Sequence, residues 1–159
     1  MSWANKIVKE AWLCSRPFTT KDPDNIIEKF KNKIVDWLAD NSYQHYGIQV
    51  LTNKGNYWLI HNAYSPDREE YGIYVTDTRL SNKWTRRKIN VVRDNVNLSK
   101  CEIVMGWREG HSKEDWLKSG TCLGAAFLLG KYLTDPNFNY EYYTESDTIL
   151  KLIKDFLLQ

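Results

Sequence analysis

Half of the residues able to act as base or nucleophile near neutral pH lie in two short segments of this chain. His45 and His61 stand at the ends of one segment, and Cys122 begins a later stretch of small and apolar residues. The 159 residues include only three histidines and three cysteines. Imidazole titrates near neutral pH, and a thiolate is a strong nucleophile. The placement therefore predicts a cysteine-dependent acyl-transfer or hydrolysis site.

The two histidines bracket a predicted β-hairpin. One arm starts at His45, the other ends at His61, and Asn53-Lys54-Gly55-Asn56 between them is a turn signal. A three-residue loop centred on Asn53 would place the two histidines directly opposite each other on one face. A two- or four-residue loop would put them on different faces unless a bulge corrected the register. The sequence leaves this register open.

Cys122 is expected in the first turn of a helix over 122–133, capped by Thr121. Unpaired backbone N–H groups and the helix dipole at that end favour a thiolate and a lowered thiol pKa. A nearby imidazole would complete a nucleophile–base pair. Small residues around the helix start would let it pack close to a sheet, near the histidines. These residues are Gly120, Gly124, Ala125 and Ala126.

Structural interpretations of the same residues stay open. A cysteine in an Ala- and Leu-rich helix is often a buried small hydrophobe, and a histidine in a strand often has a packing role. His45, His61 and Cys122 together could also hold zinc, although no supporting carboxylate is evident. His111 lies in a loop that leads into a helix and is left out of the site.

Hydrophobic periodicity predicts helices at both ends of the chain and strands between them. Helices are expected over 1–16, 23–40, 112–120, 122–133 and from 146 on, and strands over 45–51, 57–61, 71–76, 88–92 and 101–105. Residues 136–144 are expected to form an aromatic loop. Helices followed by antiparallel strands and then helices are typical of the α+β class.

Composition indicates one domain over 1–159, with 42% hydrophobic and 14% aromatic residues arguing against disorder. A net charge of +2 gives no reason to expect nucleic acid as a partner. The spacing of Cys14, Cys101 and Cys122 favours neither disulfides nor zinc. We find no signal peptide, membrane-spanning stretch or cofactor motif, so we expect a cytoplasmic protein.

The hairpin carries a resemblance to a known family. His45-Tyr-Gly-Ile-Gln-Val, followed by a turn and Tyr57-Trp-Leu-Ile-His61, resembles the paired-histidine hairpin of the lecithin:retinol acyltransferase-like family. That family belongs to the NlpC-type, circularly permuted papain-like superfamily. Residues 75–84 also resemble the middle region of some members. The resemblance covers about 43–133, which implies a papain-like core with helical N- and C-terminal extensions.

The resemblance implies that Cys122 is the nucleophile, His45 the general base and His61 the residue that orients His45. The reaction would pass through a thioester on an acyl lipid, a peptide or another amide. Family members often read Asn-Cys-Glu at the nucleophile, whereas this chain reads Thr-Cys-Leu.

That departure leaves a catalytically inactive interaction module as the alternative, with aromatics that look exposed as its binding surface. They are Trp84, Trp107, Tyr140, Tyr142 and Tyr143. The amphipathic final helix could contact a membrane surface peripherally. The acyl donor, the acceptor and the oligomeric state stay open.

Overall fold

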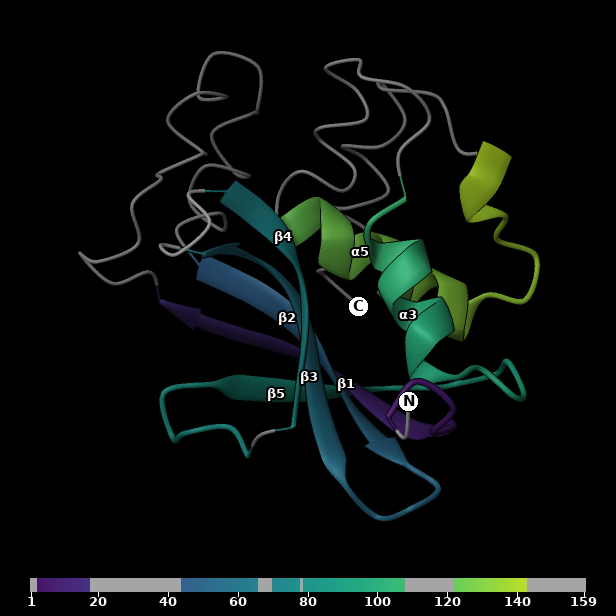
Figure 1. The fold of residues 1–159 in the computed structure, drawn as a ribbon, viewed down its shortest axis with the longest axis horizontal. Helices are drawn as coiled ribbons and strands as arrows, with labels where there is room; N and C mark the ends of the chain where they lie inside the picture. The colour runs from purple at the N-terminus through teal and green to yellow at the C-terminus, as the bar shows by residue number, and fades with distance from the viewer. Residues whose placement is uncertain (1–2, 18–43, 66–69, 78, 108–121, 143–159) are drawn as a thin grey trace.

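The computed structural model describes residues 3–17, 44–65, 70–77, 79–107 and 122–142. Five strands form one antiparallel sheet in the order β4-β3-β2-β1-β5 (Figure 1). The strands are β1 (Val8–Pro17), β2 (Gln44–Thr52), β3 (Tyr57–Ser65), β4 (Glu70–Asp77) and β5 (Thr85–Ile89). The helices are α3 (Leu98–Met105), α5 (Cys122–Thr134) and the 3₁₀ turn η1 (Tyr140–Tyr142).

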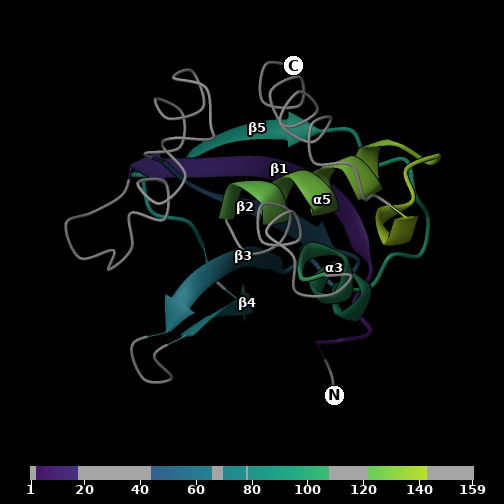
Figure 2. The ribbon, with the colours of Figure 1, turned by 90° about the horizontal axis from the view of Figure 1, so that it is seen from above.

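The sheet curves, and α3 and α5 lie on its inner side (Figure 2). Alternate strand residues such as Ile48, Val50 and Ile60 are fully buried there, in one cluster with α5 residues such as Phe127 and Leu129. Because strand side chains alternate between faces, the neighbouring residues of β2 and β3 lie on the outer face. The predicted α+β class, with an antiparallel sheet packed against helices, is confirmed.

The predicted helix over 1–16 is wrong, because Val8–Pro17 is strand β1. This strand lies between β2 and β5 and pairs with both. Ala11 and Leu13 enter the core, and Trp12 and Cys14 alternate with them. Backbone pairing on both edges therefore outweighs the helical spacing of the apolar residues, which is a weak local preference.

The predicted strand over 101–105 is also wrong, because this segment belongs to helix α3. Asn97 caps the helix, and its side-chain oxygen accepts a hydrogen bond from the Lys100 N–H at 2.7 Å. Leu98, Cys101 and Val104, spaced three residues apart, are fully buried. That spacing matches one face of a helix, so the cap and the periodicity agree.

The remaining elements follow the sequence more closely. The hairpin strands, the strand over 71–76 and the helix from Cys122 are confirmed, with α5 ending at Thr134. The strand expected over 88–92 starts and ends earlier, as β5, and the loop over 136–144 contains η1. The expected helices over 23–40, over 112–120 and from 146 on lie outside the described residues.

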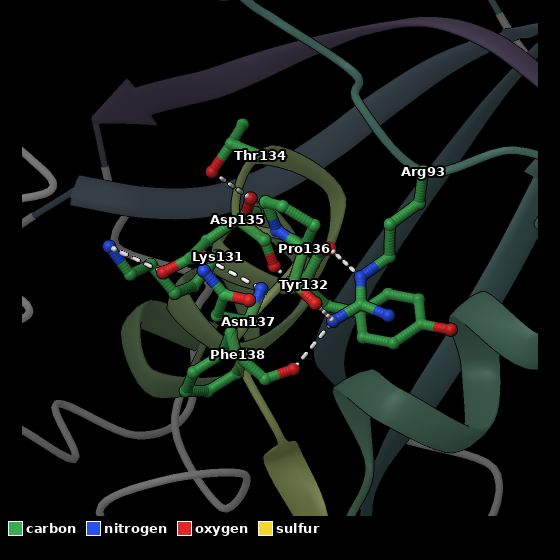
Figure 3. A network of polar contacts seen from close by, with 9 residues as sticks. Arg93, Lys131, Tyr132, Thr134, Asp135, Pro136, Asn137 and Phe138 are labelled. Carbon is green, nitrogen blue, oxygen red and sulfur yellow. Dashed lines mark hydrogen bonds and ion pairs between the residues drawn. The ribbon is translucent and has the colours of Figure 1, made fainter.

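Arg93 holds the C-terminal end of α5, far along the helix from Cys122. Its guanidinium donates hydrogen bonds to the backbone carbonyls of Tyr132, Asp135, Pro136 and Phe138 (Figure 3). It also lies 4.0 Å from the centre of the Tyr132 ring. The last carbonyls of a helix lack partners within the helix, and a cation there opposes the negative end of the dipole. This contact fixes where α5 ends.

We expect Arg93→Met to lower the free energy of unfolding by about 2–3 kcal/mol, because several carbonyls lose a charged donor. Urea unfolding followed by circular dichroism measures the loss. Lys83→Met, which removes a cation from an exposed position before β5, is the control and should change stability by less than about 0.5 kcal/mol. Equal stability of the two variants would contradict a structural role for the Arg93 contacts.

Candidate functional site

The hairpin loop has three residues, the length that would allow His45 and His61 to lie opposite each other. Its centre is one residue later in the sequence than that arrangement requires. The Thr52 N–H donates to the Asn56 carbonyl at 3.0 Å, so residues 53–55 form the loop. Gly55 has a φ of +84°, a conformation that favours glycine. The turn is therefore centred on Lys54 rather than on Asn53.

This shift by one residue moves the histidines to a diagonal arrangement. The β2–β3 ladder runs from the pair Leu51–Tyr57 to the pair Ile48–Ile60. A Cβ added to Gly47 would lie 3.1 Å from the His61 Cβ, so Gly47 faces His61. His45 lies two residues further along β2 and on the same face as Gly47. The histidines share a face, as the three-residue loop predicted, but are not directly opposite.

His45 and His61 are nevertheless bonded to each other. The distance from His45 Nε2 to His61 Nδ1 is 2.7 Å, and the ring centres are 5.0 Å apart. Burial lowers the pKa of His45 to about 3, with further lowering by the charges of His61 and Arg16. Burial and the charge of Arg16 lower the pKa of His61 to about 4. Both imidazoles are therefore neutral at pH 7, and one N–H lies between them.

Three residues that the sequence analysis did not place in the site surround this pair. Arg16 is the β1 partner of His45, and its guanidinium lies 5.4 Å from the centre of the Trp84 ring. Trp84 makes a T-shaped contact with His45, with ring centres 5.7 Å apart, and Tyr74 lies 6.3 Å from His61. Recognising β1 as a strand would have placed Arg16 beside the hairpin.

Cys122 is the first residue of α5 and is half-buried. Burial raises the pKa of its thiol to about 11. Backbone N–H groups of Tyr46, Leu123 and Cys122 itself, together with the charge of Arg16, act in the opposite direction. The expectation that the helix start would lower the thiol pKa is therefore wrong, because desolvation outweighs the N–H groups and the dipole.

The Tyr46 amide shows where the Cys122 thiol lies relative to the sheet. In an antiparallel strand, the N–H groups of alternate residues point to the same neighbour. Because the Thr52 N–H points across the hairpin to β3, the N–H of Tyr46 points to β3 as well. The β2–β3 ladder has already ended at Ile48, and this N–H instead donates toward the Cys122 sulfur. The thiol thus lies at the opening between the two strands.

The histidine pair spans the same opening, because one ring comes from β2 and the other from β3. Tyr46 belongs to the core facing α5, so His45, the preceding residue, lies on the outer face. The thiol and the imidazoles therefore approach the end of the ladder from its two sides. Arg16 acts electrostatically on all three groups.

The other candidate groups do not add to this site. Cys14 and Cys101 are buried free thiols, and burial raises their pKa values to about 11 and about 12. Within the described ranges no group of three metal-ligating side chains is placed to hold an ion. Tyr140 is buried, at 5% exposed, so its expected exposure is wrong. Trp84 and Trp107 are half-buried, and the side chains of Tyr142 and Tyr143 lie outside the description.

Comparison with known proteins finds a viral relative. The chain is 29% identical over 117 residues to an uncharacterized protein of Acanthamoeba polyphaga mimivirus, covering 70% of this chain and 98% of that protein. No protein-family model and no solved structure matches the chain. In the part of the chain that the structure describes, no helix is long and apolar enough to cross a bilayer.

The lowered imidazole pKa values predict how stability depends on pH. An unfolded histidine titrates near pH 6.5, whereas the folded pair resists protonation down to about pH 4 and 3. The free energy of unfolding therefore has its full value above about pH 6.5. It decreases as the pH falls below 6.5, by up to ~1.4 kcal/mol per pH unit for each imidazole.

Urea unfolding between pH 7.5 and 5 measures this slope. The double variant His45→Gln, His61→Gln keeps all other titrating groups and should show a shallower slope over that range. Parallel pH dependences for the variant and the natural chain would contradict the assigned burial of the pair.

Gly47 provides the space that His61 needs. An added Cβ would lie 3.0 Å from Leu59 Cδ1, 3.1 Å from His61 Cβ and 3.3 Å from the Ile60 carbonyl oxygen. We expect Gly47→Ala to displace His61 and to lower the free energy of unfolding by about 1–3 kcal/mol. Urea unfolding measures the effect.

Gly72→Ala on β4 is the matched control, because the nearest atom to its added Cβ is Tyr74 Cε2 at 3.9 Å. It should leave stability within about 0.5 kcal/mol of the natural chain. Equal effects of the two substitutions would show that a general strand preference, and not the contact with His61, governs Gly47.

Proposed function

We propose that this chain is a cysteine-dependent hydrolase or acyltransferase with a circularly permuted papain-like fold. Cys122 is the nucleophile, His45 the general base and His61 the residue that orients His45. The observation that carries this proposal is the opening at the end of the β2–β3 ladder. The Cys122 thiol and the bonded histidine pair both lie at this opening.

The ring nitrogens support this division of roles. His45 Nε2 is the nitrogen bonded to His61 Nδ1, and we assign Nδ1 of His45 to take the thiol proton. Nδ1 acts as a base when the proton of the neutral ring is on Nε2, which then donates to His61. The proposed roles require His45 Nε2 to donate and His61 Nδ1 to accept, so that the proton of His61 is on Nε2. In this arrangement His61 holds the basic tautomer of His45, the role of the third residue in a catalytic triad.

The reaction follows from these roles. The Cys122 sulfur attacks an acyl carbonyl carbon while its proton moves to His45 Nδ1. The tetrahedral intermediate collapses, the leaving alcohol, thiol or amine takes that proton, and a thioester remains on Cys122. Water or an acceptor alcohol or amine then attacks the thioester as His45 removes its proton. The acid or the new ester or amide leaves, and the sulfur regains a proton from His45.

Backbone N–H groups at the start of α5 suit the oxygen that becomes negative. The amides of Cys122 and Leu123 belong to the first turn, where N–H groups lack partners within the helix. They lie close enough to the sulfur to act on its pKa. An oxyanion formed next to the sulfur would meet the same donors. Acyl esters, thioesters and amides, including acyl lipids and peptides, all form such an intermediate.

A second candidate function is a catalytically inactive papain-like interaction module. The raised pKa of the Cys122 thiol favours it, because a thiol that resists ionisation is a poor nucleophile without efficient proton transfer. Leu123 also stands where family members often carry an acid. The two candidates differ in whether an acyl group becomes attached to Cys122.

We expect the natural chain to hydrolyse p-nitrophenyl esters and to carry a transient acyl group on Cys122, seen by mass spectrometry after acid quenching. Cys122→Ala and His45→Ala should each lower kcat by about a thousandfold or more. Cys14→Ala is the matched control, since Cys14 is a buried thiol on the same sheet face as the histidines, and it should retain activity.

An acyl group on Cys14 or Cys101 instead of Cys122 would overturn the assignment of the nucleophile. A natural chain that neither hydrolyses esters nor becomes acylated, while remaining folded, would favour the interaction module.

A further inference from the structure

We infer that Trp84 is a positioning residue for His45, an inference that rests on the proposed function for its catalytic meaning. Trp84 holds the His45 ring from the β1 side of the sheet, whereas His61 holds it from the β3 side. A row of side chains in contact crosses the sheet at the end of the β2–β3 ladder. The row consists of Trp84, Arg16, His45, His61 and Tyr74.

The strand order explains how this row forms. Trp84 immediately precedes β5, which pairs with β1 from Ser15 and Thr85 onward (Figure 1). Arg16 follows Ser15 and is the β1 partner of His45. For its ring to lie 5.7 Å from the ring of His45, Trp84 must reach across β1 toward β2. The Arg16 guanidinium, 5.4 Å from the centre of that indole, covers Trp84 where it crosses.

The histidine ring needs such a second contact. Rotation about the terminal side-chain torsion of histidine is broad and has two nearly equivalent positions, which exchange the places of a ring nitrogen and a ring carbon. The hydrogen bond to His61 fixes the position of one nitrogen, and the plane of the ring can still tilt about that bond. The T-shaped contact with Trp84, at an interplanar angle of 62°, restricts that tilt. Nδ1 of His45 then keeps one direction.

A comparison with Trp12 distinguishes the positioning of His45 from the general packing of a tryptophan on this sheet face. Trp12 is a second half-buried tryptophan on the same sheet face, also covered by an arginine, with the Arg86 guanidinium 4.3 Å from its ring. Its aromatic neighbour is Tyr57, at 5.8 Å, rather than a histidine. Trp12 is therefore a matched control that carries the same kind of cation–π contact away from the histidine pair.

Long-range proton–nitrogen NMR spectra of the uniformly ¹⁵N-labelled full chain test the inference without any substrate. The chain has three histidines, so His111→Gln and His61→Gln assign the ring signals. At pH 7 we expect His45 to give one protonated and one unprotonated ring nitrogen, the pattern of a fixed tautomer. Trp84→Leu should let the His45 ring tilt and so weaken its bond to His61, which moves both nitrogens toward the averaged position of a mixed tautomer, and Trp12→Leu should not.

Kinetics provide the second readout. Trp84→Leu should lower kcat for p-nitrophenyl ester hydrolysis by on the order of tenfold to a hundredfold with little change in KM, since the base is misplaced but the acyl group still binds. Trp12→Leu should retain kcat. If Trp84→Leu does not fold, Trp84→Phe carries the test, with a smaller displacement of the same signals.

Each outcome has one meaning. Ring signals of His45 that stay unchanged in the Trp84 variant, or that move equally in Trp12→Leu, would overturn the inference. A natural chain without hydrolase activity would overturn the proposed function, while the tautomer of His45 would still decide whether Trp84 positions the ring.

Discussion

The end of the β2–β3 ladder is the constraint on which the rest of the site depends. Beyond the pair Ile48–Ile60, β2 stays paired with β1 and β3 with β4, and no further β2–β3 ladder pair follows among the described residues. An open ladder leaves amide groups that need other partners. The Cys122 sulfur accepts from one of them, and the bond from His45 to His61 ties the strands together in place of backbone pairing.

Helix α5 approaches this opening with its N-terminal end, where Cys122 lies. At its far end, Arg93 binds the Tyr132 carbonyl and carbonyls of the loop that follows the helix. The middle of α5 is packed into the core through Ala125, Phe127 and Leu129. The position of Cys122 along the sheet is therefore set by contacts remote from the thiol. Gly47 acts similarly for the histidine pair, since its missing side chain leaves the space that His61 and Leu59 occupy.

Local signals predicted the parts of the fold that depend on few residues. The turn at Gly55 and the apolar run from Cys122 sufficed for the hairpin and for α5. β1 was missed because Trp3, Ile7, Val8, Ala11 and Trp12 fit a helical period by chance, and only the partners on both edges make it a strand. The hairpin register stayed open because it depends on which residue lies at the centre of the turn. The pKa of the Cys122 thiol was predicted in the wrong direction because burial cannot be read from a helix start. Arg16 and Trp84 join the site only through β1.

The two buried partners of the proposed reaction are both shifted toward their neutral forms. Burial raises the pKa of the thiol to about 11 and lowers that of His45 to about 3, so a resting thiolate–imidazolium pair is disfavoured from both sides. Proton transfer then has to accompany attack on the carbonyl, when the new negative charge moves from sulfur to an oxygen near the N–H groups of Cys122 and Leu123. Such coupling requires that Nδ1 of His45 already faces the sulfur, because a base that must first rotate loses the advantage of proximity. Fixing the ring in the resting state therefore contributes to this chemistry beyond the presence of the thiol and the base.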